Sequence, residues 1–562
     1  MHDKKRFEMT TKRDLLLILI TALALVTAAC GSSEAADGDG PSIATVIDGD
    51  TGGNVNLVTS NGRPPVEGGG LAYGLAAETD GWNPTLSRWS PSGLVVGRAM
   101  FDFLVVTDQS GDWQPEALAG LASNADFTEW TFTTRPGMTF HNGKPFDAEA
   151  LKRHLEYIRA SPLTGVTLRR VLGSLEVTSP TTLVAGLTFP WASLPFAFAS
   201  QIGAVADADW LASGSATDPV GAGAFQFVSW DPGVQLEVRA FDDYWRDGAP
   251  LLDEVTFVPV LDDGARRAQL VAGDLDVIGI NDGANIREFR EQAQAGERQL
   301  VCGENSDGAE QFVMLNLAKP PFDDPDVRLA AAKALERGSL AEQIGDGEFA
   351  VASSPYDERS PWHVDTTYPD FDPAAAAEMV AAIETETGPI TIELKSSNTQ
   401  TALDLNEAVA EDWRAAGFDV DITTREGVLN IRDTLFGDFE AVTWQLFDGA
   451  HPVNEAAFWT PEASAPILEP ALNFARNEDP ELVAKIESAM GEGDPAESRR
   501  KWGEVQRQIN VGLPYLWIAH GKNCLAAAPD VVDLVTWETS AGTPGAEFIA
   551  GSQPLWQVWL DR

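Results

Sequence analysis

The sequence predicts an α/β protein with more than one lobe. A chain of 562 residues is too long for one hydrophobic core, because single cores stop growing at roughly 250–300 residues. Two stretches, residues 131–158 and 390–422, each combine the alternating pattern of strands with the periodicity of a helix. The chain is therefore expected to form two or three lobes that mix strands and helices throughout.

Residues 131–158, TFTTRPGMTFHNGKPFDAEALKRHLEYI, are predicted to form two short strands followed by a helix. Apolar residues at alternate positions predict the strands, and Asn142-Gly143 suits a tight turn. Asp147 can cap the helix, which is expected to begin near Ala148. The apolar face of that helix comprises Leu151, Leu155 and Ile158.

Turn and cap residues mark three further units. Gly417 can end the helix of a strand–helix–strand unit in residues 390–422, and such units normally form right-handed parallel crossovers. Asp231-Pro232-Gly233 predicts the turn of a hairpin over residues 225–241. Asp372-Pro373 predicts the start of an Ala-rich helix that ends before Gly388-Pro389.

The first residues are typical of an export signal. Five basic residues precede an apolar run of about 15 residues, Leu15 to Ala29, which is shorter than the roughly 20 that span a bilayer. Thr27-Ala28-Ala29-Cys30 resembles the lipobox of bacterial lipoproteins, so residues 1–29 are expected to be removed and Cys30 to carry a diacylglyceryl group. Two acyl chains hold a protein at a membrane stably. An uncleaved transmembrane anchor is the alternative.

Residues 30–70 are predicted to be a flexible tether. Gly, Ser, Asp, Asn and Pro dominate this stretch, and it has too few large apolar residues to form a core. No later stretch is apolar enough to span a membrane, so the rest is expected to be an extracytoplasmic soluble body.

The charge excludes one class of partner. The net charge is -46, and removing the signal, with five basic and three acidic residues, makes it about -48. Nucleic acid is therefore not expected as a partner, because its phosphates would be repelled. Besides Cys30 the chain has only Cys302 and Cys524, which could pair outside the cytoplasm. Their pairing stays open, because the sequence does not give the distance between their Cα atoms.

Motifs of catalysis are missing from the sequence. It contains no HExxH, GxSxG or Walker A motif, and its six histidines are too scattered to predict a metal site. Gly221-Ala222-Gly223 lacks the third glycine of a dinucleotide fingerprint and is interpreted as a turn that needs small residues. We expect neither a cofactor nor a metal, and an enzyme only as an alternative.

Seven segments of the chain resemble one protein family. Residues 130–158 closely resemble the signature of the extracellular solute-binding proteins of family 5, the peptide, dipeptide, oligopeptide and nickel binders of ABC importers. The resemblance runs from about Leu71 to Arg562. The other segments are GWNPTLSRW, MFDFLVVTDQSGDWQPEALAGLA, DPVGAGAFQFVSWDPGVQLEVRAFDDYW, PDVRLAAAKALERGSLAEQI and YPDFDPAAAAEMVAAI, with a further match around LPYLWIAHGKNCL.

This resemblance implies a type II periplasmic-binding-protein fold, in which two α/β lobes are joined by a hinge. Residues 71–262 would form the first lobe with an extra subdomain at about 106–200, residues 263–522 the second, and residues 523–562 a return to the first. The lobes would close on a ligand, and the closed monomer would dock on a membrane permease. The lipid anchor and tether would keep it within reach of that permease.

Candidate ligand contacts come from both lobes. Three of the 17 tryptophans, Trp82, Trp89 and Trp444, lie in loop-like sequence where aromatic rings could line a ligand site. Peptide-binding members place an acidic residue after a tryptophan to receive the peptide's amino terminus, and Asp448 after Trp444 is the nearest match, although Asp448 could equally cap a loop. The full candidate set is Trp82, Asn83, Trp89, Trp444, Phe447, Asp448, His451 and Asn454.

The expected function is capture of peptides for an ABC importer by a lipid-anchored protein, on the outer face of the bacterial cell membrane or in the periplasm. Oligosaccharides are the alternative ligand, because flat sugar faces stack on tryptophan rings. A secreted hydrolase is a third hypothesis, which needs a clustered nucleophile and base or a carboxylate pair. Free nickel is disfavoured because the histidines are dispersed.

Overall fold

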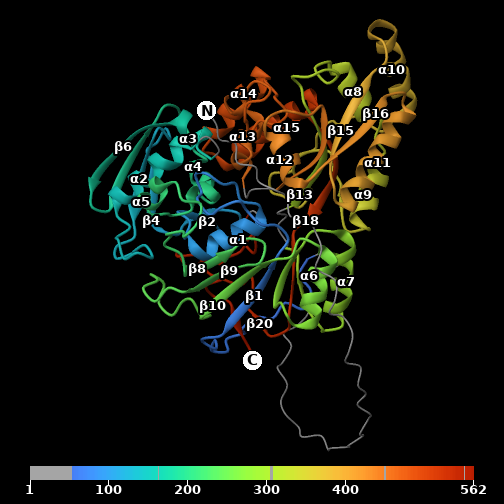
Figure 1. The fold of residues 1–562 in the computed structure, drawn as a ribbon. Helices are drawn as coiled ribbons and strands as arrows, with labels where there is room; N and C mark the ends of the chain where they lie inside the picture. Colours follow the sequence, from blue (N-terminus) through green and yellow to red (C-terminus); the bar gives the residue numbers. More distant parts are fainter. Residues whose placement is uncertain (1–52, 162–163, 304–307, 448–450, 550) are drawn as a thin grey trace, which may run out of the picture. The chain divides into compact units, whose positions relative to one another are not determined.

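A computed structural model describes residues 53–161, 164–303, 308–447, 451–549 and 551–562 (Figure 1). The predicted signal, Cys30 and Asp448 lie outside these residues. The described chain is a mixture of strands and helices, as predicted, and three main sheets organise it. None of its helices is long and apolar enough to cross a bilayer.

A seven-stranded sheet in the order β12-β19-β11-β1-β10-β9-β8 forms the first lobe. β1 is parallel to β10 and β11, and the other pairs are antiparallel. Its strands are β1 (Gly70–Leu75), β8 (Phe225–Asp231), β9 (Gln235–Ala240), β10 (Glu254–Pro259), β11 (Val277–Ile280), β12 (Gln299–Val301) and β19 (Cys524–Ala527).

Helices cover both faces of this sheet. Alternate residues of β11 point into different cores: Val277 packs with α1 (Pro91–Met100), whereas Ile278 packs with α6 (Asp263–Ala272) and α7 (Gly283–Gln294). Figure 1 shows α6 and α7 together beside the sheet. Burial on both faces explains why β11, VIGI, is apolar without alternation.

A four-stranded antiparallel sheet, β4-β5-β7-β6, forms the predicted extra subdomain. Asp147 accepts a hydrogen bond from the Ala150 N–H and caps α2, which confirms the predicted helix. The second strand predicted near Met138 is wrong, because only an isolated bridge joins Thr139 to Pro145. The elements here are β2 (Val105–Thr107), β3 (Trp113–Pro115), β4 (Leu118–Ser123), β5 (Glu129–Thr134), α2 (Ala148–Ala160), α3 (Val166–Val171), β6 (Leu172–Ser179), β7 (Thr182–Leu187), α4 (Leu194–Ala197), η1 (Gln201–Gly203) and α5 (Ala208–Ser213).

A six-stranded sheet in the order β14-β18-β13-β17-β15-β16 forms the second lobe. The predicted strand–helix–strand unit is confirmed as β15, α11 and parallel β16. The elements are β13 (Gly308–Leu315), α8 (Pro325–Ala334), α9 (Arg337–Gly345), β14 (Ala350–Val351), α10 (Pro373–Thr387), β15 (Thr391–Ser397), α11 (Gln400–Ala415), β16 (Asp419–Arg425), α12 (Gly427–Leu435), β17 (Ala441–Phe447), η2 (Pro452–Asn454), α13 (Ala456–Trp459), η3 (Pro461–Ala463), α14 (Pro480–Met490), α15 (Pro495–Gly512) and β18 (Tyr515–Lys522).

The first sheet extends past the boundary predicted at residue 262. Strands β11 and β12 both pair within it, so the chain passes into the second lobe only after Val301. The reason is that α6, β11, α7 and β12 continue the alternation of the first lobe, and the sequence pattern does not mark where that alternation ends. The last short strands, β20 (Val531–Val532) and β21 (Trp559–Leu560), pair with each other after the return through β19.

The predicted tether is shorter than expected. Residues 53–69 are not free. Val55 forms an antiparallel bridge with Leu300 of β12, and the Ser60 N–H donates a hydrogen bond to the Asp533 side chain. Arg63 forms an ion pair with Asp561. A Gly- and Pro-rich composition therefore did not distinguish a free linker from a strap bound along the body by backbone and polar contacts.

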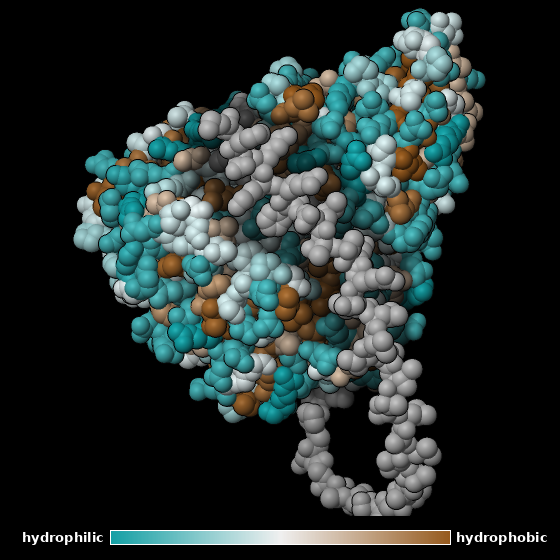
Figure 2. Space-filling model, in the orientation of Figure 1, coloured by the Kyte–Doolittle hydropathy of each residue, from teal (hydrophilic) through white to brown (hydrophobic). Residues whose placement is uncertain are grey.

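The surface agrees with the charge of the chain. Figure 2 shows a face that is mostly hydrophilic, with hydrophobic residues scattered over it. Such isolated apolar residues are normal on soluble domains.

Candidate functional site

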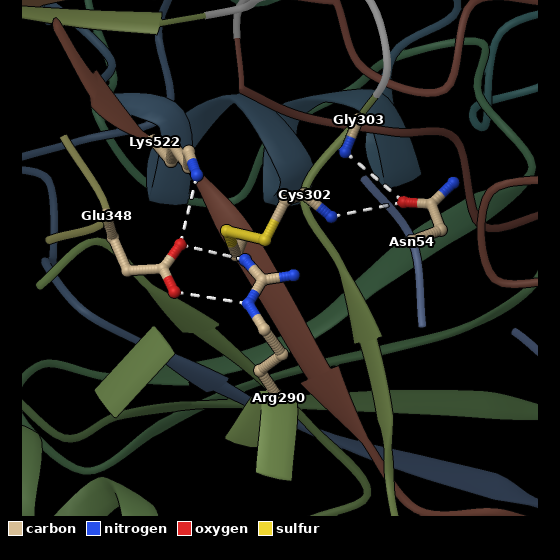
Figure 3. The surroundings of a disulfide bond; sticks show 7 residues. Asn54, Arg290, Cys302, Gly303, Glu348 and Lys522 are labelled. Atoms are coloured by element: carbon tan, nitrogen blue, oxygen red, sulfur yellow. Dashed lines mark hydrogen bonds and ion pairs between the residues drawn. A yellow bond between two sulfur atoms is a disulfide. The ribbon is translucent and has the colours of Figure 1, made fainter. Parts of the chain in front are cut away.

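Two connections lead from the first lobe to the second, and a disulfide joins them. Cys302 directly follows β12, and Cys524 opens β19 after β18. Their Cα atoms are 4.1 Å apart although the residues are separated by 222 positions in the chain. Figure 3 shows this bond. It fixes the two connections to each other at the point where any lobe motion must bend the chain.

A partly buried group of charges lies beside the disulfide (Figure 3). Glu348 of the second lobe accepts hydrogen bonds from Nε and Nη2 of Arg290 on α7, at 3.1 and 2.8 Å, and from Nζ of Lys522 at 3.0 Å. Burial by itself would raise the pKa of Glu348, but these donors lower it below its ordinary value. Glu348 is therefore ionised and binds the first lobe to the second.

The start of the described chain is bound at the same place. The side-chain oxygen of Asn54 accepts from the N–H groups of Cys302 and Gly303, at 3.1 and 3.3 Å (Figure 3). The strap at residues 53–69 thus contacts a connection between the lobes.

The three predicted contacts of the first lobe are packed inside it. Trp82, Asn83 and Trp89 have exposed fractions of 1%, 0% and 5%. The Trp82 ring lies 5.7 Å from Trp230, and the Trp89 ring stacks on Phe101 at 5.7 Å. The interpretation of Trp82 and Trp89 as a ligand-facing wall is therefore corrected: their rings turn into the core and hold the loop of residues 81–89.

Asn83 also has a structural role. Its side-chain oxygen accepts from the N–H and the hydroxyl of Thr85, and its amide donates to the Ser215 carbonyl. Every polar group of this buried side chain is thus used within the lobe. We reassign Asn83 from ligand contact to support of the turn.

The predicted residues of the second lobe lie on β17 or in the segment that follows it. Trp444 is half-buried on that strand, where its ring meets Phe474 edge-on at 5.7 Å. Phe447 ends the strand, and the following Asp448 lies outside the described residues. Asn454 ends η2, and its buried side-chain oxygen has no hydrogen-bond partner within the described part of the chain.

His451 packs between rings of two lobes. Phe196 of α4 stacks on it at 4.3 Å, and Trp362 meets it edge-on at 4.4 Å. Its Nδ1 accepts from the Val453 N–H and caps η2. Burial lowers the pKa of His451 to about 3, so the ring is neutral at physiological pH. In this arrangement His451 makes a contact between the subdomain and the second lobe.

A cation that sequence reasoning missed lies against an aromatic ring of the second lobe. Arg88 belongs to the first-lobe loop GWNPTLSRWS, and its guanidinium lies 5.1 Å from the centre of the Phe458 ring on α13. Phe458 is 5.6 Å from Phe474, which contacts Trp444. Arg88, Phe458, Phe474 and Trp444 therefore form a continuous row that crosses from one lobe to the other. The only signal in the sequence was a basic residue between two tryptophans.

No group of three or more His, Cys, Asp or Glu side chains suited to a metal ion occurs among the described residues. The buried histidines instead make packing contacts. The His141 ring, for example, meets Phe241 edge-on at 4.9 Å.

Comparison with known proteins identifies the family. The family model "Bacterial extracellular solute-binding proteins, family 5 Middle" matches residues 112–464, which is more than half of the chain. The chain belongs to this family. Its members are solute-binding proteins, and this family 5 protein has the two-lobe fold of periplasmic binding proteins.

Curated relatives of this family 5 protein include the glutathione-binding proteins GsiB. That of Pectobacterium atrosepticum is 25% identical over 422 residues, covering 70% of this chain and 78% of the relative. That of Salmonella typhimurium is 24% identical over 460 residues, covering 78% and 87%.

Solved structures share the fold. DppA from Helicobacter pylori, in complex with the peptide STSA, aligns with a TM-score of 0.76 at 18% identity, covering 88% of this family 5 protein and 99% of DppA. AppA from Bacillus subtilis, in complex with a nonapeptide, aligns with a TM-score of 0.75 at 19% identity, covering 89% and 100%. NikZ from Campylobacter jejuni, in complex with Ni(L-His), aligns with a TM-score of 0.72 at 17% identity, covering 84% and 97%.

Proposed function

We propose that this solute-binding protein captures peptides between its lobes and delivers them to an ABC permease, without chemical change to the ligand. The observation that carries the proposal is the row from Arg88 through Phe458 and Phe474 to Trp444, which brings a cation of the first lobe together with aromatic rings of the second. Peptides suit such a surface because they offer charged ends, backbone hydrogen-bonding groups and apolar side chains.

The relatives support a peptide ligand. DppA and AppA were solved with peptides, and the GsiB proteins are named for glutathione, which is itself a peptide. The oligosaccharide alternative is weakened, because two of its three stacking candidates, Trp82 and Trp89, are buried in the first lobe.

Intrinsic fluorescence tests the ligand class. The full-length chain, purified in mild detergent, would be titrated separately with mixed short peptides and with plant-type oligosaccharides, because lobe closure changes the surroundings of several indole rings. We expect a saturable change with peptides alone. A change with oligosaccharides alone would replace peptides as the ligand, and no change with either would refute both.

The proposal includes anchoring through Cys30. A diacylglyceryl group on its thiol would hold the mature monomer on the outer face of the membrane, close to the permease. Cys30→Ser should move the protein from the membrane fraction to the soluble fraction and abolish incorporation of labelled palmitate. Retention of the variant in washed membranes would contradict lipid anchoring.

A further inference from the structure

The two lobes touch each other on both sides of the disulfide that joins their connections. Strand β12 ends just before Cys302 and β19 begins at Cys524, and both lie in the first sheet between α1 on one face and α7 on the other. On the α1 side, Arg88 contacts the Phe458 ring. On the α7 side, α7 meets the turn of residues 345–348 at the end of α9 (Figure 1), and we call this the α7–α9 contact. A rotation about the disulfide that separates the lobes on one side therefore presses them together on the other.

The α7–α9 contact is made by backbone and has no room for a side chain. A Cβ at Gly283, the first residue of α7, would lie 1.8 Å from the Gly345 carbonyl oxygen and 2.8 Å from the Gly345 Cα. Both glycines are buried, and the Gly345 carbonyl also accepts from the Glu348 N–H at 2.8 Å, which closes the turn. Closely packed backbone resists compression and cannot rotate aside as a flexible side chain can. The lobes therefore cannot approach further at this point.

Each surface of the α7–α9 contact is fixed within its own lobe. Asp282 caps α7, and Phe289 buries that helix in the core of the first lobe. In the second lobe, Lys522 of β18 donates to Glu348 at 3.0 Å and so fastens the turn to the sheet. Because neither surface is a loose loop, a force on the contact moves whole lobes and not the turn alone.

Two ion pairs hold the same surfaces together. Arg287 of α7 lies 2.6 Å from Asp346, and Arg290 lies 2.8 Å from Glu348. Opposite charges at these distances favour the states in which the α7–α9 contact is made. The backbone approach between the glycines excludes the states in which the lobes rotate past it.

We infer that the α7–α9 contact limits how far the lobes open on the α1 side, where the row from Arg88 to Trp444 lies, and that it influences ligand affinity without touching the ligand. Opening on that side presses α7 against the turn, whereas closing relieves the contact. The free protein is therefore held part of the way towards closure, which lowers the cost of closing around a ligand. This inference rests on the proposed function, because it concerns the lobe motion by which a ligand is captured.

Distances between two spin labels measure the lobe opening without any ligand. The labels are placed on Ala212→Cys of α5 and Ala496→Cys of α15, two exposed positions in different lobes. These positions flank the place where the Ala192 N–H donates to the Met490 carbonyl at 2.8 Å, so the distance should grow as the lobes open. The full-length chain carries Cys30→Ser, which leaves only the introduced thiols free because the other two cysteines are bonded to each other.

Gly283→Ala should shorten the mean distance between the labels in the free protein, because its Cβ forces α7 and the turn apart. The same variant should bind a pool of mixed short peptides about 3- to 10-fold more tightly, since less of the closing motion remains. Gly264→Ala is the matched control. It adds the same methyl group to the exposed start of α6, where only the Asp262 side chain is near, at 3.4 Å, and it should leave both the distance and the affinity unchanged.

A second variant tests the same inference without a steric change. Arg287→Gln combined with Asp346→Asn removes the exposed ion pair of the contact and should shift the distance and the affinity in the same direction. The affinity should increase about 2- to 5-fold, which is the range that exposed ion pairs give. Its control is Arg414→Gln combined with Glu407→Gln, an exposed pair within the second lobe. This double variant decides the question where Gly283→Ala does not fold.

Label distances in the free protein that equal those of wild type in both variants would overturn the inference, and so would weaker peptide binding by both. Shortened distances with no peptide binding by any variant would overturn peptide capture and support the limit on opening. The two proposals therefore fail in different ways.

Discussion

The guanidinium of Arg88 lies 5.1 Å from the centre of the Phe458 ring, and this contact joins a loop of the first lobe to α13 of the second. Phe458 is buried in the second lobe, so this contact lies where the two lobes meet. Because Phe474 lies between Phe458 and Trp444, the guanidinium of Arg88 lies at one end of a row of three rings. The row therefore gives the candidate site a charged end and an apolar end.

Trp444 should contribute to ligand affinity more than to stability. It is half-buried on β17, and the ring of Phe474 contacts it from one side. Trp444→Ala should weaken peptide binding about 10-fold or more, because an aromatic side chain at a binding site contributes one to several kcal/mol. Calorimetric titration with the peptide pool measures this. Trp113→Ala, which removes a half-buried ring of β3, is the control, and unchanged affinity in Trp444→Ala would remove Trp444 from the site.

Local patterns predicted the elements of the fold, whereas contacts between distant residues escaped them. Asp147 before α2 and Gly417 after α11 act within a few residues of their own position, so the sequence was sufficient to locate both helices. The predicted need for a small residue at Gly221 is also confirmed. A Cβ at that position would lie 2.0 Å from the Met100 carbonyl oxygen, which is too close for any other residue.

The site was predicted less well, for a physical reason. Aromatic residues in loop-like sequence suggested ligand contact, but such a loop can turn its rings inward, as Trp82 and Trp89 do. Arg88, which lies between them in the sequence, is exposed instead of buried. Only its contact with the Phe458 ring of the second lobe distinguishes it from an ordinary surface arginine. The pairing of Cys302 with Cys524 likewise depends on two connections that meet in space after 222 residues.

Removing the disulfide should destabilise the protein without preventing ligand binding. Because the bond closes a loop of more than 200 residues, the chain-entropy estimate is about 5 kcal/mol, and losses of about 2–5 kcal/mol are typical when native disulfides are removed. The paired variant Cys302→Ser with Cys524→Ser should unfold at a lower temperature in a calorimetric scan. Reductant should lower the midpoint of wild type and leave that of the variant unchanged; equal midpoints in all four conditions would contradict this role.

Glu348 should stabilise the protein in a pH-dependent way. Its donors lower its pKa in the folded state, so its contribution is present above the ordinary carboxyl pKa and is lost as pH falls through the lowered value. Glu348→Gln leaves Arg290 and Lys522 without their shared anion and should cost about 1–3 kcal/mol at pH 7. The difference from wild type should shrink as the pH is lowered below about 4.

Urea unfolding at several pH values measures this difference. Glu407→Gln is the control, because Glu407 forms an exposed ion pair with Arg414 that should contribute little. A loss in Glu348→Gln that is the same at pH 3 and pH 7 would show that the ionised carboxylate is not its cause.

Asp102 should show the opposite dependence on pH. Burial, and then repulsion from Glu116, raises its pKa to about 7, although Trp245, Arg246 and Tyr244 act against this shift. A carboxyl whose pKa is raised on folding contributes most below its unfolded value near 4, and that contribution is lost as the pH rises towards 7. Ionised Asp102 should therefore cost on the order of 2–4 kcal/mol at neutral pH compared with the protonated form.

Asp102→Asn tests this with little change of shape. Tyr244 and Trp245 both donate to the carboxylate, and an asparagine can accept one of these bonds while its amide donates to the Tyr244 hydroxyl. In urea unfolding, wild type should lose stability relative to this variant between pH 4 and pH 7. The control is Asp421→Asn on the exposed side of β16, whose free energy of unfolding should change with pH in the same way as that of wild type. A constant difference between wild type and Asp102→Asn across that range would mean that Asp102 does not change its charge there. The neighbouring cavity of about 20 Å³, which Asp102 and Glu116 line, has room for about one water molecule that could bind to either carboxyl group.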